Sequence, residues 1–127
     1  MMARTSVVTG AASGIGAAVV ALLEGRGDRV IGVDLAGTDV HADLSTPAGR
    51  ASMVDQVTRL AGGPVDAVIA NAGVLGGDTG AIVHVNYFGA VATLDGLRPL
   101  LAQGDAPRAV ATVSTALLQE VDDTVEA

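Results

Sequence analysis

The sequence predicts an α/β fold, in which the strands of a parallel sheet alternate with helices. Three observations support this prediction. Short apolar runs rich in β-branched residues recur along the chain, segments of helical periodicity separate them, and the runs are apolar throughout. Strands joined by helices form right-handed crossovers and therefore a parallel sheet. Because the strands do not alternate with polar residues, we expect helices to cover both faces of the sheet, a doubly wound arrangement.

The elements can be placed in order along the chain. The expected strands cover residues 5–9, 29–33, 40–42, 65–70 and 109–113. A first helix begins at Gly14 and stops in the glycine-rich segment 25–28. A second helix has Thr46 as its N-cap and Pro47 as its first residue, and it ends at the Gly-Gly-Pro segment 62–64. A third, long helix is expected over residues 81–102.

Composition bounds the function. The 127 residues fit one domain, half of them are apolar, and the net charge is −7 with no lysine. The arginines are scattered and form no basic stripe, so we expect no nucleic-acid partner. Cysteine is absent, and His41 and His84 lack ligand spacing, so we expect no metal. Without a leader pattern or an apolar run of about 20 residues, we expect a soluble cytoplasmic protein with no membrane partner.

A glycine-rich turn joins the first strand to the first helix. Gly10 permits a tight turn, Gly14 lets the backbone approach a pyrophosphate, and Gly16 lets the helix pack on the strand. Unpaired N–H groups at the helix N-terminus then face the phosphates. Ser13 and Ile15 lie within the same turn. This context predicts a Rossmann-type dinucleotide-binding domain, the alternative being a plain turn in another α/β protein.

Asp34 ends the second strand, 18 residues after Gly16, where a carboxylate can accept hydrogen bonds from the adenosine ribose. Because this carboxylate repels a 2′-phosphate, it favours NAD over NADP. No arginine or lysine at residues 11–13 or 35–36 reverses that preference. Leu35 follows it and is expected beside the cofactor. The alternative is an ordinary loop aspartate.

The turn Thr9-Gly10-x-x-x-Gly14-x-Gly16 resembles that of the short-chain dehydrogenase/reductase family. Four further segments resemble family motifs in the same order: Asp43-Leu44, Asn71-Ala72-Gly73, Asn86 within residues 84–89, and Ser114-Thr115. Residues 41–46 and 85–90 are similar to the bacterial 3α-hydroxysteroid dehydrogenase/carbonyl reductase subgroup.

The resemblance implies NAD-dependent hydride transfer between a small-molecule secondary alcohol and its ketone, with a hydroxysteroid as one candidate. Asp43 and Leu44 would contact the adenine, and Asn71, Ala72 and Gly73 the ribose and nicotinamide side of the groove. Asn86 would support a proton relay.

Ser114 or Thr115 would supply the catalytic hydroxyl. The position within the motif favours Thr115, and the usual residue type favours Ser114. Each site residue also has a structural alternative. Asn71 can serve only the sheet, Asn86 can bond local backbone, and Ser114 and Thr115 can cap the strand end.

The family's catalytic tyrosine, followed four residues later by lysine, has no counterpart here. The only tyrosine is Tyr87, and Val91 stands four residues after it. We therefore expect residues 1–127 to be the cofactor-binding part of a longer single domain. A natural half-domain that binds nucleotide without catalysis is the alternative. A further alternative is a methyltransferase that uses S-adenosylmethionine. The glycine spacing and the Asn-Ala-Gly segment argue against it.

The long helix 81–102 is apolar on more than one face. Ile82, Val85 and Gly89 form one line, and another comprises Leu94, Leu97 and Leu101. Family members pack the corresponding helix against its copy, and strand 109–113 would form an unpaired apolar edge. We therefore expect a homo-oligomer that buries this helix.

Overall fold

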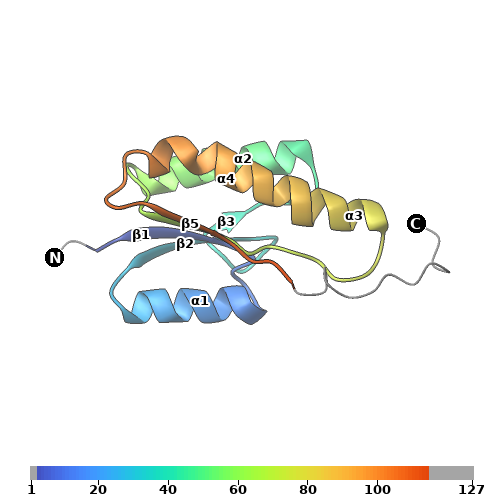
Figure 1. The fold of residues 1–127 in the computed structure, drawn as a ribbon, viewed down its shortest axis with the longest axis horizontal. Coiled ribbons are helices and arrows are strands. Elements are labelled where there is room, and N and C mark those ends of the chain that lie inside the picture. Colours follow the sequence, from blue (N-terminus) through green and yellow to red (C-terminus); the bar gives the residue numbers. More distant parts are fainter. Residues whose placement is uncertain (1–2, 115–127) are drawn as a thin grey trace.

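The computed structural model describes residues 3–114 and contains a parallel sheet of five strands in the order β3-β2-β1-β4-β5 (Figure 1). The strands are β1 (Thr5–Thr9), β2 (Arg29–Asp34), β3 (Val40–His41), β4 (Ala67–Ala70) and β5 (Arg108–Ala111). Val7 of the central strand pairs with Ile31 on one side and Val68 on the other, and all three are buried. The predicted doubly wound Rossmann-type fold is confirmed.

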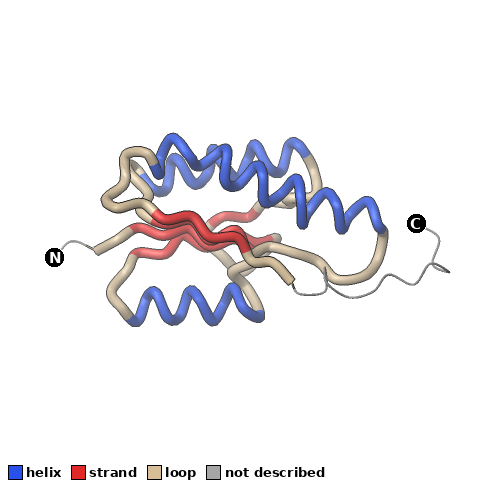
Figure 2. Tube along the Cα trace, in the orientation of Figure 1, coloured by secondary structure: helices blue, strands red, loops and turns tan. Residues whose placement is uncertain are grey.

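Helices lie on both sides of this sheet (Figure 2). Helix α1 (Gly14–Gly25) packs against β1 and β2 on one face, while α2 (Pro47–Ala61) and α4 (Ala90–Leu101) lie on the other (Figure 1). The core lies mainly under α2 and α4, where Met53, Val57 and Leu97 are fully buried against the sheet. Because all the paired strands are parallel, the carboxyl ends of β1, β2, β4 and β5 lie at one edge of the sheet, where the site is found.

One region departs from the expected single helix over residues 81–102. A short helix α3 (Thr79–Val83) continues into the π-helical segment η1 (His84–Gly89), and α4 follows without a break. A π-helix bonds each carbonyl to the N–H five residues later instead of four, and it usually needs tertiary contacts to persist. Helical periodicity alone does not reveal it.

Two expectations about exposed faces need correction. Leu94, Leu97 and Leu101 do not face outwards, because α4 packs them into the chain's own core. The outward face of this helical run carries Val83, Tyr87 and Val91 instead, which are all exposed. In the described part of the chain β5 is also exposed along its whole length, so the expected cover on both faces does not reach this strand.

The strand bounds differ slightly from those expected, since β4 begins at Ala67 and β5 ends at Ala111. Val65, expected in the strand, is buried, and its N–H donates to the Leu100 carbonyl at the end of α4. A tertiary hydrogen bond thus replaces the expected strand pairing at this residue. Figure 1 shows β1, β2 and β5 running together toward the end of the molecule at which α1 begins.

Candidate functional site

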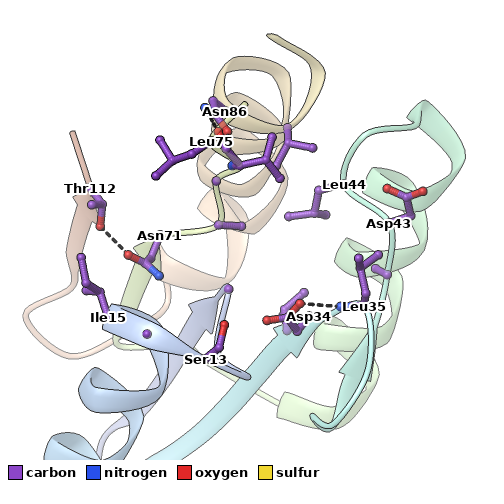
Figure 3. A pocket seen from close by; sticks show the side chains of 18 of the residues that line it. Ser13, Ile15, Asp34, Leu35, Asp43, Leu44, Asn71, Leu75, Asn86 and Thr112 are labelled. Carbon is purple, nitrogen blue, oxygen red and sulfur yellow. Dashed lines mark hydrogen bonds between the residues drawn. The ribbon is translucent and has the colours of Figure 1, made fainter. Parts of the chain in front are cut away.

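The carboxyl ends of the strands open onto a groove of about 1200 Å³ (Figure 3). The glycine turn forms its floor, the ends of β2 and β3 one side, and the ends of β4 and β5 with η1 the other. The sequence-predicted residues that line it are Gly10, Ser13, Gly14, Ile15, Asp34, Leu35, Asp43, Leu44, Asn71, Ala72, Gly73, Asn86 and Ser114. Motifs spread over a hundred residues therefore meet in one groove.

The glycines of the turn serve two different purposes. Gly10 and Gly14 have φ values of +68° and +56°, which favour glycine, and both line the groove, where a Cβ at Gly14 would meet nothing within 4 Å. A Cβ at Gly16 would lie 1.9 Å from the Gly10 carbonyl oxygen, and Gly16 does not line the groove. This geometry fits the predicted role of Gly16 in the close packing of α1 on the turn.

Ser13 precedes α1 as its N-cap in an extended conformation, yet its hydroxyl accepts no capping hydrogen bond. The first N–H groups of a helix have no partner within the helix. Here Gly14 and Ile15, the first two residues of α1, line the groove, and a Cβ at Gly14 would meet nothing within 4 Å. This arrangement fits a phosphate group, because the N–H donors and the positive end of the helix dipole both favour an anion.

Asp34 stands at the end of β2, and backbone groups fix its carboxylate. One oxygen accepts from the Ala12 N–H at 3.0 Å and the other from the Leu35 N–H at 2.7 Å (Figure 3). Each carboxylate oxygen has a second lone pair for a further donor, such as a hydroxyl group. Two backbone contacts thus hold the acceptor in place at the groove without using up its capacity.

Asp43 and Leu44 form the neighbouring wall. Asp43 accepts from the Ser45 hydroxyl at 2.6 Å and from the Ser45 N–H at 3.0 Å, and these bonds lower the pKa of the Asp43 carboxyl, the hydroxyl contributing most. Leu44 is 6% exposed and packs close to Gly89, where a Cβ would lie 3.3 Å from the Leu44 Cβ. Asp43 therefore offers a charged, exposed edge and Leu44 an apolar surface.

Asn71 joins three strands. The Thr9 hydroxyl at the end of β1 accepts from the N–H groups of Asn71 and Ala72, at 3.0 and 2.9 Å. The Asn71 side-chain oxygen accepts from the Thr112 hydroxyl just beyond β5, at 2.9 Å (Figure 3). The sequence alone leaves open whether Asn71 serves the sheet or the groove. It braces the strand ends and also lines the groove.

Asn86 makes a reciprocal pair of bonds with the segment that follows β4. Its side-chain oxygen accepts from the Val74 N–H at 2.8 Å, and its amide nitrogen donates to the Val74 carbonyl at 3.0 Å. The alternative of bonding to local backbone is wrong, because Val74 lies 12 residues away in the sequence. The pair fastens the segment next to Gly73 to the π-helical segment.

Ser114 lines the groove beyond β5, whereas Thr115 lies outside the described residues. Tyr87 is 61% exposed and packs edge-on against Phe88, and it does not line the groove. It is therefore not placed to act as an acid or base there. In the range 3–114, no group of histidine, aspartate or glutamate side chains could hold a metal ion. No helix in the same range could span a lipid bilayer.

Several groove residues carry no motif in the sequence. They are Val33, Ala42, Val74, Leu75, Val85, Thr112 and Val113. All of them lie within two residues of a predicted strand end or motif residue, so this proximity is the signal that could have found them. Apolar side chains carry no chemical pattern of their own, and only the folded chain shows that they share one groove.

The groove can be compared with those of known proteins. The chain is 40% identical over 113 residues to a 3-alpha-hydroxysteroid dehydrogenase/carbonyl reductase from Comamonas testosteroni, covering 87% of this chain and 44% of that protein. It is 36% identical over 132 residues to a 1-deoxy-11-beta-hydroxypentalenate dehydrogenase from Streptomyces avermitilis, covering 81% and 48%. No protein-family profile matches the sequence.

Comparison with solved structures finds the same class of enzymes as the sequence comparison. The 3-alpha-hydroxysteroid dehydrogenase from Pseudomonas sp. B-0831, crystallised with NADH, superposes with a TM-score of 0.89 at 45% identity, over 91% of this chain and 46% of that one. The chain belongs to the short-chain dehydrogenase/reductase family. A short-chain dehydrogenase/reductase from Brucella ovis matches with a TM-score of 0.68 at 25% identity, over 80% of this chain and 58% of that one. The chain spans about half the length of the relatives it matches.

Proposed function

We propose that this short-chain dehydrogenase/reductase forms the NAD-binding part of an oxidoreductase that transfers hydride between NAD(H) and a secondary alcohol or ketone. One observation carries the proposal: the Asp34 carboxylate is held at the groove by the Ala12 and Leu35 N–H groups, next to the glycine turn. A phosphate-compatible helix start and a ribose-compatible acid in one groove match the two polar parts of a dinucleotide.

The residues divide the cofactor between them. Gly10, Ser13, Gly14 and Ile15 would hold the pyrophosphate, and Asp34 with Leu35 the adenosine ribose. Asp43 and Leu44 would contact the adenine. Asn71, Ala72 and Gly73 would line the ribose and nicotinamide side. The bound cofactor supplies the hydride donor or acceptor, and the protein's part is to orient it.

The substrate would enter at the other end of the groove. Leu75, Val113 and Val74 line this end; Leu75 is fully exposed and Val113 is 80% exposed. An apolar alcohol or ketone would cover them, and a hydroxysteroid is consistent with the named relatives from Comamonas testosteroni and Pseudomonas. Ser114 or Thr115 would steady the substrate oxygen, with Asn86 behind the proton relay.

Residues 1–127 contain no Tyr-x-x-x-Lys segment, which the family uses as its acid and base. We therefore propose that these residues are the cofactor-binding part of a longer catalytic domain, which is consistent with their spanning about half the length of the relatives. We place the protein in the cytoplasm.

Cofactor titration tests this proposal. We expect NADH to bind more tightly than NADPH, because the NADPH 2′-phosphate would face the Asp34 carboxylate, and S-adenosylmethionine not to bind. Asp34→Ala should weaken NADH binding by about 10- to 100-fold, since a hydrogen bond to a charged group is worth about 1.5–3 kcal/mol. The same substitution should reduce the difference between the affinities for NADH and NADPH. Asp55→Ala removes a remote, exposed carboxylate on α2 and is the control. Equal binding of NADH and NADPH by the unmutated chain would contradict the proposal.

A further inference from the structure

Arg50 lies behind the groove, on the first turn of α2, and reaches two of its walls. One nitrogen of its guanidinium, Nη1, donates to the Leu44 carbonyl at 3.0 Å and to the His84 carbonyl at 3.4 Å. The guanidinium carbon also lies 5.7 Å from the centre of the Phe88 ring. Leu44 belongs to the wall formed by Asp43 and Leu44, while His84 and Phe88 belong to the π-helical segment η1.

The two contacts on η1 lie near opposite ends of a single π turn. His84 is its first residue, and Phe88 is its last but one. A π-helix is less stable than an α-helix on its own, so contacts from elsewhere must select it. A hydrogen bond from a cationic donor and a cation facing an aromatic ring are two contacts that can favour one register of the turn. Within the part of the chain that the structure describes, Arg50 is the cation that makes both.

The π register determines where Asn86 points. A one-residue slip turns a side chain by roughly 100° around the helix axis. Such a turn would take the Asn86 amide away from the Val74 backbone, with which it now makes hydrogen bonds of 2.8 and 3.0 Å. Gly73 and Val74 line the groove, so a change at the helix would reach the groove wall.

We infer that Arg50 is a positioning residue, which holds residues 84–89 in the π register and thereby keeps Asn86 paired with Val74. Arg50 does not itself line the groove or contact a reacting group, and it acts on the wall around Val74 through Asn86. Its relevance to hydride transfer rests on the proposed function. Its effect on the geometry of Val74 does not, because no ligand is needed to observe it.

Amide hydrogen exchange, followed residue by residue by NMR without any cofactor, tests the inference. Arg50→Gln should speed exchange of the Val74 N–H by about tenfold and shift the side-chain amide signals of Asn86, because their hydrogen bonds open more often. In an Asn86→Ala background, Arg50→Gln should add no further change at Val74. Arg50→Lys keeps the charge without the planar fork and should give an intermediate effect.

Arg59→Gln is the matched control, since Arg59 lies on the same helix in an exposed ion pair with Asp55. If Arg50→Gln leaves Val74 exchange equal to that of the control, or if its effect persists fully in the Asn86→Ala background, the inference is wrong. If Arg50→Gln does not fold, Arg50→Lys decides: unchanged Val74 exchange overturns the inference, and faster exchange supports it. If the unmutated chain fails to bind NADH while Arg50→Gln still speeds exchange of the Val74 N–H, the proposed function is wrong and this inference is supported.

Discussion

At the scale of single residues, the glycine turn shows how one methyl group decides the approach of a helix to a strand. Gly16 and Gly25 both lie in α1, without a positive φ value. A Cβ at Gly16 would meet the Gly10 carbonyl oxygen at 1.9 Å, whereas a Cβ at Gly25 would meet nothing within 4 Å. The same substitution therefore has opposite physical consequences at the two ends of one helix.

Gly16→Ala should lower the free energy of unfolding by about 1–3 kcal/mol, because the backbone must shift to relieve the overlap. Gly25→Ala should leave it unchanged or raise it by up to about 1 kcal/mol, since alanine has the higher helix propensity. Urea denaturation measures both values. Equal effects of the two substitutions would show that the close approach at Gly16 is not maintained in solution.

Asp66 is a second residue whose surroundings matter, because backbone N–H groups bind its carboxylate. Its carboxylate accepts from the Thr5 N–H at 2.8 Å and the Asp105 N–H at 2.9 Å, at the edge of the sheet remote from the groove. These bonds lower the pKa of the Asp66 carboxyl, the Thr5 bond most, and nearby Arg4 contributes a smaller part. A carboxyl whose folded-state pKa is below its unfolded value stabilises the fold above the unfolded pKa of about 3.9.

Asp66→Asn should therefore destabilise the protein at pH 7 by about 1 kcal/mol. The deficit should shrink as the pH falls below about 4 and through the lowered pKa, where the wild-type carboxyl becomes protonated and loses its advantage. Denaturation between pH 7 and pH 2.5 measures it, with the exposed Asp55→Asn as the control, expected within about 0.5 kcal/mol. A deficit that stays constant with pH would exclude this linkage.

At the scale of elements, the start of α2, which its N-cap and proline predict from the sequence, also holds one wall of the groove. Thr46 is its N-cap, and its hydroxyl oxygen accepts from the Gly49 N–H at 3.0 Å, with Pro47 in the first turn. Gly49 packs so closely that a Cβ would lie 1.7 Å from the Asp43 carbonyl oxygen. The start of α2 therefore also fixes the wall that contains Asp43.

Thr46→Ala should lower the free energy of unfolding by about 0.5–2 kcal/mol, because the Gly49 N–H loses its acceptor. Thr46→Ser keeps the hydroxyl oxygen and should restore most of the loss. Thermal or urea denaturation of the three proteins gives the comparison. If serine and alanine are equally destabilising, the methyl group of Thr46, and not its oxygen, is the stabilising part.

At the scale of the whole molecule, the surface of the helical run 79–101 bears on assembly. Val83, Tyr87 and Val91 are 45%, 61% and 40% exposed, and all of β5 is exposed as well. Exposed apolar faces and unpaired strand edges favour contact with another chain. Because Leu97 is fully buried in the core, Leu97→Glu would test folding and not association.

We predict a homo-oligomer that buries the outward face of this helical run. Val91→Glu should shift the chain toward the monomer, whereas Arg26→Glu, exposed at the end of α1 on the other face of the sheet, should change the association little. Sedimentation at micromolar concentration measures the state of each, and circular dichroism verifies that both variants fold. A monomeric wild-type chain, or an oligomer unaffected by Val91→Glu, would disprove this interface.

The sequence by itself determined the order of elements, the glycine turn, the cap at Thr46 and the family, because these depend on local periodicity, backbone freedom and motif spacing. It also identified most of the groove residues, since parallel strands bring their carboxyl ends to one edge. Only the tertiary structure decided the π-helical segment, the inward direction of Leu97 and the pairing of Asn86 with Val74. The same is true of the exposure of β5. These features depend on contacts between residues distant in the chain, such as Arg50 with His84, which carry no periodic or local signature.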